Sequence, residues 1–514
     1  MLAAGSVLLA TSAFAGRSHV GGTFTVAEQG PGLSMDPQVT YYTTTWGLEY
    51  ATAAKLFNFP DARGAAGARI VPEVAAGYTV SKDGRTYTFP IRKGYRFSDG
   101  TKVTAKSFVY AFKRVLSPKL QSPGAQFIQD PAGTYVTSYK AQGGSFVVHL
   151  RRPDETFMVK LTFPFFQATS TKLPLDHEVV TVTAANQIPT VGPYMLTYND
   201  PNTTTQIRRN PYYRGPRPHH LDGVTLYWNQ QIPPHGVSSW DERGVAPQEQ
   251  DALAARFGIN QARFWVKPAA CTGYIGLNTR YGVFRDVQMR KAFNWAIDRK
   301  AYAAQAGLAA FPWTHLLPPN FPGSIMKREL QPYSVHPNYV KAKKLAAGHF
   351  GSGKITVVYR ASGVVGPAQK EVVAHDLQQL GFKPQDVKWL WGDWEIGPPD
   401  WNGNWWDMEI STAWCQDYPD PYDFFIPRLL KSDFPGYINS AKWRRRIRTA
   451  RKLVGPVRLK TFGKLDIQLM NQYAPVAVTR TYNNLSFFSN RVDPRSLRWK
   501  TVYGDWDYAA IRLK

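Results

Sequence analysis

The chain has 514 residues, of which 43% are hydrophobic and 14% aromatic. This apolar content is enough to build folded cores, which excludes an intrinsically disordered protein, and the length predicts about two to four domains. The formal net charge of +25, from 62 Lys and Arg against 37 Asp and Glu, is compatible with a nucleic-acid partner, an anionic membrane or a basic exported surface, so local pattern has to decide between them.

The first 15 residues contain an apolar stretch of signal-peptide length, and Ala13-Phe14-Ala15 has the small-x-small pattern of a cleavage site. The basic residues that normally precede such a stretch are missing. Either the true start lies upstream of Met1, which we favour, or the segment is only a helical leader. We assign residues 1–16 to a signal peptide and expect export to the periplasm or the cell exterior. No Cys follows the stretch to carry a lipid, and no other stretch has the length and apolarity of a membrane span.

Alternating apolar and polar residues predict strands in the first half of the chain. Residues 22–26, 87–91 and 146–150 alternate in this way, and Asp83-Gly84 is typical of a hairpin turn. A further β-rich section is expected from residue 191 to residue 228.

Two helices are expected among these strands. An apolar helical segment should extend to Phe59. Thr104 should cap the second helix, which Pro118 ends, and one face of that helix carries Phe108, Phe112 and Val115.

The pattern changes after Cys271. Asp286 is expected to begin a helix, and the strand-like residues 355–359 precede a helix over about residues 371–380. This β–α order predicts an α/β domain over residues 268–484, joined to an α+β portion.

The densest basic run lies between residues 442 and 452, where seven residues are Lys or Arg. Trp443, Ile447 and Ala450 recur at helical spacing within it, so we interpret the run as an amphipathic surface helix with a solvated basic face. No zinc-ligand spacing, basic-zipper heptad or RNA-recognition signature accompanies it, and we therefore expect no nucleic-acid partner.

Residues 411–425 place one acid, Asp417, between a Trp-Cys pair and a turn built on Pro419 and Pro421, with aromatic residues on both sides. A carboxylate walled by aromatic side chains suits a cationic ligand group, because an ion pair is stronger in a partly dry pocket than in water. The alternative is that Asp417 only caps the turn before a helix.

The two cysteines, Cys271 and Cys415, favour one disulfide in an exported chain, and such a bond would brace the segment that carries Asp417. Two buried free thiols are the alternative.

Catalysis is not expected, because the ten histidines are scattered and no nucleophile elbow, zincin helix or phosphate loop occurs. Asp417 and Asp420 could be a glycosidase pair, but two acids around a Pro turn are common.

Several motifs in this order resemble the family of extracellular solute-binding proteins that deliver oligopeptides and dipeptides to ABC transporters. They are Ser81–Phe89 leading into Arg92–Ala105, Val191–Tyr194, Leu277–Thr279, Phe284–Arg299, Leu317–Pro319 and Trp414–Pro421. The match covers nearly the whole mature chain.

This resemblance implies an α/β fold of two lobes joined as a clamshell, with an additional α+β domain inserted near the N-terminus. Residues 17–56, 186–267 and 485–514 would form the first lobe, residues 57–185 the extra domain and residues 268–484 the second lobe. The implied protein is a monomer that needs no cofactor, encloses a peptide between its lobes and delivers it to the permease subunits of an ABC transporter.

The resemblance also implies site residues. Asp417 would pair with the α-amino group of the ligand, and Cys271 would be bonded to Cys415. Trp394 would line a side-chain pocket, and the residues from Tyr42 to Trp46 would run alongside the peptide. Beside Asp417, Trp414, Trp394 and Trp391 are candidates for apolar walls that tolerate varied side chains. A core position is the alternative for each Trp.

The chain departs from this pattern at the far end of the ligand. Ser411 stands where some oligopeptide binders have an Arg, and residues 361–370 contain no His. The ligand could therefore be longer, shorter or not a peptide, for example an oligosaccharide or a metal chelate. A sensor built on the same clamshell is a further alternative, and a secreted hydrolase is the most distant one.

Overall fold

The computed structural model describes residues 20–60, 67, 69–130, 133–231, 240–359, 365–391, 406–425, 429–430 and 436–514. The predicted signal peptide, residues 1–16, lies outside the described residues. Within them the fold is mixed α/β, as predicted.

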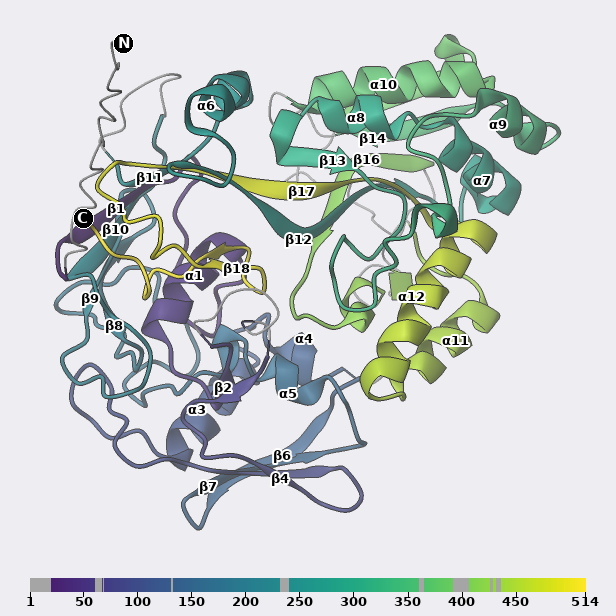
Figure 1. Ribbon diagram of the computed structural model, residues 1–514. Coiled ribbons are helices and arrows are strands. Elements are labelled where there is room, and N and C mark those ends of the chain that lie inside the picture. The colour runs from purple at the N-terminus through teal and green to yellow at the C-terminus, as the bar shows by residue number, and fades with distance from the viewer. Residues whose placement is uncertain are drawn as a thin grey trace, which may run out of the picture.

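One large sheet runs through the molecule (Figure 1). In order across it the strands are β15 (Val387–Trp391), β14 (Ile355–Tyr359), β16 (Met408–Cys415), β12 (Phe264–Leu277), β17 (Val476–Phe488), β11 (Glu242–Gly244), β1 (Thr23–Ala27), β10 (Gly223–Tyr227), β9 (Thr204–Arg209) and β8 (Tyr194–Asp200), and β13 (Ala310–Pro312) pairs with β17. The β–α order predicted around residues 355–380 is present, because β14 is followed by α10 (Val365–Leu380) and pairs in parallel with β15.

The two longest strands, β12 and β17, connect the two ends of this sheet. They pair antiparallel from Phe264↔Phe487 to Gly276↔Val476. β12 also pairs with β16 at one end, and β17 pairs with β11 at the other. In Figure 1 this ribbon arches between the β1 side and the β14 side, so both sides are joined mainly by two strands.

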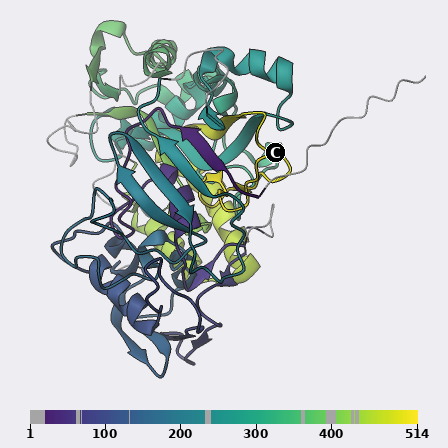
Figure 2. The same cartoon turned by 90° about the vertical axis from the view of Figure 1, so that its left-hand side faces the viewer.

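A separate four-stranded antiparallel sheet lies at the bottom of Figure 1, and Figure 2 shows the same blue segment below the large sheet after a 90° turn. Its order is β4 (Thr79–Val80), β5 (Thr86–Pro90), β7 (Ser145–Leu150) and β6 (Val136–Gln142). Two short pairs complete the strands: β2 (Phe57–Asn58) with β3 (Val71–Pro72), and β18 (Trp499–Lys500) with β19 (Asp505–Trp506).

The helices cover these sheets. The α-helices other than α10 are α1 (Thr43–Thr52), α3 (Ala105–Val115), α4 (Ala125–Ile128), α5 (Phe157–Lys160), α6 (Gln250–Phe257), α7 (Val287–Ala296), α8 (Arg299–Ala304), α9 (Tyr339–Ala346), α11 (Ala441–Arg451) and α12 (Gly455–Gln472). Short 3-10 helices are η1 (Pro164–Phe166), η2 (Pro247–Glu249), η3 (Val283–Arg285), η4 (Gly307–Ala309), η5 (Arg328–Leu330), η6 (Pro384–Asp386) and η7 (Pro421–Phe424). None of the helices in the described ranges combines the length and apolarity that crossing a bilayer requires.

The local helix signals are confirmed at their starts. The Thr104 hydroxyl accepts from the backbone N–H of Lys106 at the start of α3, and the Asp286 carboxylate accepts from Gln288 at the start of α7. Trp443 and Ile447 of α11 are buried, so the basic run is an amphipathic helix as predicted. The prediction that the helix extends to Phe59 is wrong, because α1 ends at Thr52 and the chain continues in an extended conformation into β2.

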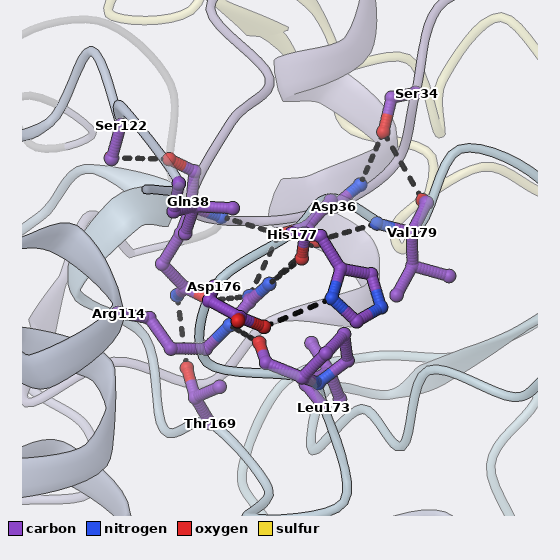
Figure 3. Close-up of polar contacts among 12 residues, drawn as sticks. Ser34, Asp36, Gln38, Arg114, Ser122, Thr169, Leu173, Asp176, His177 and Val179 are labelled. Carbon is purple, nitrogen blue, oxygen red and sulfur yellow. Dashed lines mark hydrogen bonds and ion pairs between the residues drawn. The ribbon is translucent and has the colours of Figure 1, made fainter. Parts of the chain in front are cut away.

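A buried ion pair ties α3 to the loop after β1. Both guanidinium Nη atoms of Arg114 lie 2.8 Å from the two carboxylate oxygens of Asp36, and neither side chain is exposed. Figure 3 shows the Arg114 guanidinium facing Asp36, with Gln38 beside it. The backbone N–H of Val179 also donates to Asp36, at 3.0 Å. Three segments distant in sequence therefore meet at one carboxylate.

An acidic cluster is formed by Glu28, just after β1, and by the first residues of β11 and β19, Glu242 and Asp505. Burial raises the pKa of Glu28 to about 7. Burial, followed by the neighbouring charge of Asp505, raises the pKa of Glu242 well above its usual range, and burial likewise raises that of Asp505. Each acid is therefore held more strongly protonated in the folded chain than in the unfolded chain.

This cluster predicts a pH dependence of stability. An acid whose pKa is raised by folding stabilises the fold below its unfolded pKa, and that contribution is lost as the pH rises through the folded pKa. Glu242→Gln imitates the protonated acid, so its free energy of unfolding should fall less between about pH 5 and about pH 7 than that of the wild type. Urea denaturation across this range measures the difference, with the exposed Glu329→Gln as control. Parallel pH profiles for Glu242→Gln and the wild type would contradict the prediction.

Candidate ligand-binding site

The segment around Asp417 is anchored by a strand pair and a disulfide. β16 runs antiparallel to β12 with Cys271 directly opposite Cys415, and the two Cα atoms are 3.9 Å apart. The predicted disulfide between them is present. Because Asp417 follows Cys415 by two residues, this covalent link restricts where the carboxylate can move.

Asp417 is 8% exposed, and its carboxylate contacts the distant N-terminal part of the chain. The Tyr41 hydroxyl donates to Asp417 Oδ1 at 2.6 Å, across 376 positions of sequence. Tyr41 lies just before α1, and its ring packs against Trp46, Phe127 and Phe165. An aromatic cluster and a carboxylate therefore meet at this point, and most of its rings come from the N-terminal part of the chain, not from residues 411–425.

A second acid lies directly behind Asp417. The backbone N–H of Asp417 donates to Asp423 Oδ2 at 2.8 Å, and Asp423 is buried in η7. Burial, and then the negative charge of Asp417, raise the pKa of Asp423 well above its usual range, although hydrogen bonds from the Asp417 backbone and the Trp414 side chain oppose the rise. The protonated form of Asp423 is therefore more favoured than in an exposed aspartate, because two close buried carboxylates repel each other.

Neighbouring contacts hold the 416–423 segment against two other parts of the molecule. The Gln416 side chain donates to the carbonyl of Thr501 at 2.6 Å. The Tyr418 ring meets Phe163 edge-on, and Lys160 Nζ lies 5.4 Å from its centroid. These contacts hold the segment that carries Asp417 against the turn between β18 and β19 and against the α5–η1 region.

An ion pair beyond this segment links α11 to the loop before α5. Arg451 Nη2 lies 2.8 Å from Asp154 Oδ2, and both side chains are nearly buried. Burial acts to raise the pKa of Asp154, but the charges of Lys160 and Arg451, together with hydrogen bonds from Thr134 and Thr156, lower it to about 2. Asp154 is therefore ionised, and the pair persists, at ordinary pH.

The other predicted ligand-binding residues differ in how deeply they are buried. Trp414 is half-buried on β16 and packs against the core formed with α12. Trp46 is 2% exposed and contacts Phe163, so in this conformation it is a core residue. Tyr42, at the N-cap of α1, is 60% exposed. Trp394 lies outside the described residues.

Sequence reasoning missed two residues of this site, Tyr41 and Asp423. Tyr41 lies next to the predicted Tyr42, but only a tertiary contact distinguishes which tyrosine reaches Asp417. Asp423 lies in the quoted acidic segment, and its six-residue spacing from Asp417 carried no signal of contact.

Two other kinds of site, a metal site and a glycosidase pair, were compared with the residues around Asp417. Within the described ranges, no three His, Cys, Asp or Glu side chains gather in a way that could hold a metal ion. Asp420, the other half of the hypothetical glycosidase pair, is bound by Arg458, whose Nη2 lies 2.7 Å from its Oδ1. The geometry suits recognition of a cationic group by Asp417 next to a hydroxyl donor.

Comparison with known proteins agrees with this reading. Residues 69–436 match the family model described as bacterial extracellular solute-binding proteins, family 5 Middle. The dipeptide-binding protein of Escherichia coli is 23% identical over 452 residues, covering 82% of this chain and 81% of that protein. Heme-binding protein A of Haemophilus influenzae is 24% identical over 413 residues, covering 73% and 71%.

Solved structures share the fold over nearly the full length. Clavulanic acid biosynthesis oligopeptide binding protein 2 superposes with a TM-score of 0.81 at 19% identity, covering 96% of both chains. The periplasmic binding protein DppA from Helicobacter pylori, in complex with the peptide STSA, gives a TM-score of 0.75 at 18% identity and covers 96% of this chain and 98% of that one.

The family acts outside the cytoplasm, its members serve ABC transporters by binding solutes, and they are not enzymes. The predicted family, compartment and absence of catalysis are thereby confirmed. This chain belongs to family 5 of the bacterial extracellular solute-binding proteins.

Proposed function

We propose that the chain captures a peptide between two lobes and delivers it to the permease of an ABC transporter. In this proposal residues 17–56, 186–267 and 485–514 form one lobe, residues 268–484 the other, and residues 57–185 the extra domain. The observation that carries the proposal is the geometry of Asp417. This nearly buried carboxylate accepts a hydrogen bond from the Tyr41 hydroxyl of the opposite lobe, with 2.6 Å between the two oxygens.

The α-amino group of the peptide is the cation that we assign to Asp417. An ammonium has three donors, so it can bind Asp417 and still reach the Tyr41 oxygen or a backbone carbonyl. It would also offset the negative charge that raises the pKa of Asp423. Trp414, Trp394, Tyr42 and Trp46 are proposed to line the path of the peptide, which for Trp46 requires a more open conformation than the one described.

Ligand binding would act by shifting a population of open and closed forms. The Tyr41–Asp417 contact spans the proposed lobes, as does the Gln416–Thr501 hydrogen bond. A ligand that contacts both lobes favours the closed form by its difference in affinity for the two forms. The ribbon of β12 and β17 is the proposed hinge, because these strands run continuously from one lobe to the other.

The names of the relatives support a peptide without restricting the class of ligand. Several are named for dipeptides or oligopeptides, but others bind heme or glutathione, and one solved structure holds agropinic acid. The Asp417 site favours a ligand with a free amino group among these.

Mass spectrometry of the solutes released by denaturing freshly purified protein tests the proposal. Peptides in the wild type that disappear in Asp417→Ala are the expected result. A non-peptide solute retained by both proteins, with both folded, would overturn the peptide assignment and the role of Asp417.

A further inference from the structure

A pocket of about 430 Å³ lies between the chain after β17 and the loop before β10, and none of its lining residues belongs to the Asp417 site. Its lining comes from the turn at residues 493–498, from the last five residues of the chain and from the loop before β10. The lining residues are Pro218, His220, Asp493, Arg495, Ser496, Arg498, Ala510 and Arg512. Three arginines and one aspartate give the lining a net positive charge.

The aspartate is already neutralised within the pocket. Arg495 donates to Asp493 through Nε at 3.0 Å and through Nη2 at 3.3 Å, so the acid of the lining is held in a bidentate pair, and Arg498 and Arg512 line the same pocket. Arg498 Nη1 donates to the carbonyl oxygens of Arg495 and Leu497, and these bonds orient its planar guanidinium.

The surroundings of His220 also indicate a positive electrostatic potential in the pocket. Arg512 Nη2 lies 3.2 Å from His220 Nε2, and since a guanidinium only donates, this ring nitrogen is the acceptor of a neutral imidazole. Burial, and then the charges of Arg512, His219 and Arg209, lower the pKa of His220. Asp493 is the acid that lines the same pocket, and Asp222 is paired with Arg209.

We propose that this pocket binds an oxyanion of the phosphate class between the guanidinium groups of Arg498 and Arg512. Arginine suits this role, because its planar set of N–H donors matches the oxygens of a phosphate. The pocket has room for a free phosphate with bound water or for the phosphate group of a larger molecule such as an anionic lipid.

The bound anion would also interact with His220. A phosphate beside the ring favours the protonated, positively charged form of His220. In that form Nε2 carries a proton and can donate to the anion instead of accepting. By linkage, phosphate should raise the pKa of His220, and acidification should tighten phosphate binding.

NMR titration of the histidine side chains of the full chain, with and without inorganic phosphate at constant ionic strength, tests the site. His220 is assigned with a His220→Gln variant. We expect phosphate to raise the titration midpoint of His220, and Arg498→Gln and Arg512→Gln to weaken phosphate binding by about tenfold or more. Arg445→Gln, which removes an exposed charge from α11, should bind like the wild type. An unchanged His220 midpoint, or equal phosphate affinity in Arg512→Gln and Arg445→Gln, would overturn the proposal.

Co-sedimentation with vesicles distinguishes the two sources of phosphate. Binding to phosphatidylglycerol vesicles that inorganic phosphate displaces and that Arg512→Gln abolishes would identify a lipid headgroup. Binding of inorganic phosphate alone would identify a soluble anion. Vesicle binding weakened equally by Arg445→Gln and Arg512→Gln, with no response of His220 to phosphate, would show an effect of net charge only and refute the pocket.

Discussion

Asp417→Asn is expected to weaken binding of a peptide with a free N-terminus by about 30-fold or more, since losing one partner of a nearly buried charge pair costs 2 kcal/mol or more. Asparagine keeps the size of the side chain and can still accept from Tyr41, so the local fold should be preserved. Isothermal titration with the peptide identified by mass spectrometry measures the change.

Two controls isolate the charge pair. Glu329→Gln removes an exposed carboxylate on η5, outside the 416–423 segment, and should leave affinity unchanged. An N-acetylated form of the same peptide has no ammonium, so it should bind the wild type weakly and should lose little further affinity in Asp417→Asn. If acetylation and Asp417→Asn each leave affinity at the wild-type level, the α-amino group is bound elsewhere.

Arg114→Met is expected to lower the free energy of unfolding by about 3–5 kcal/mol. Methionine fills part of the space but leaves Asp36 charged, buried and without the bidentate pair. The arginine also donates to the carbonyl of Pro174 at 2.6 Å, and this bond between α3 and a distant loop is lost as well. Urea denaturation followed by circular dichroism measures the effect.

Matched variants test whether the ion pair is the cause. Lys113→Met alters the exposed neighbour on α3 and should change stability by only about 0.5 kcal/mol. In the double variant Asp36→Asn with Arg114→Met, no charge is left buried, so the loss should be smaller than the sum of the two single losses. Additive losses, or an Arg114→Met protein as stable as Lys113→Met, would argue against the pair.

Local signals predicted the individual elements well, and they failed where tertiary contacts ended an element. The caps at Thr104 and Asp286 act through neighbours two residues away, so the sequence carries all the information they need. The helix before Phe59 stops early at Thr52, and the buried chain that follows pairs with residues 71–72. Apolar residues alone do not distinguish a buried helix from buried extended chain.

The candidate site was predictable only in part, and mainly through resemblance. The Trp-Cys-x-Asp segment of the family pointed to Asp417 and to the disulfide between Cys271 and Cys415, which the structure contains. The residues that complete the surroundings, Tyr41 and Asp423, were not predicted, because neither spacing nor composition reports a contact across 376 positions or through a 3-10 turn.

By itself, the sequence determined the secondary structure of the strongly periodic segments and the family. It also predicts the export signal. The tertiary structure decided which side chains meet: Tyr41 with Asp417, Arg114 with Asp36, and Arg498 and Arg512 around one pocket. The physical reason is that periodicity records only that a face is buried or exposed. Which partner covers that face depends on which distant segments pair, as β12 does with β16 and β17, and a local pattern does not name the partner.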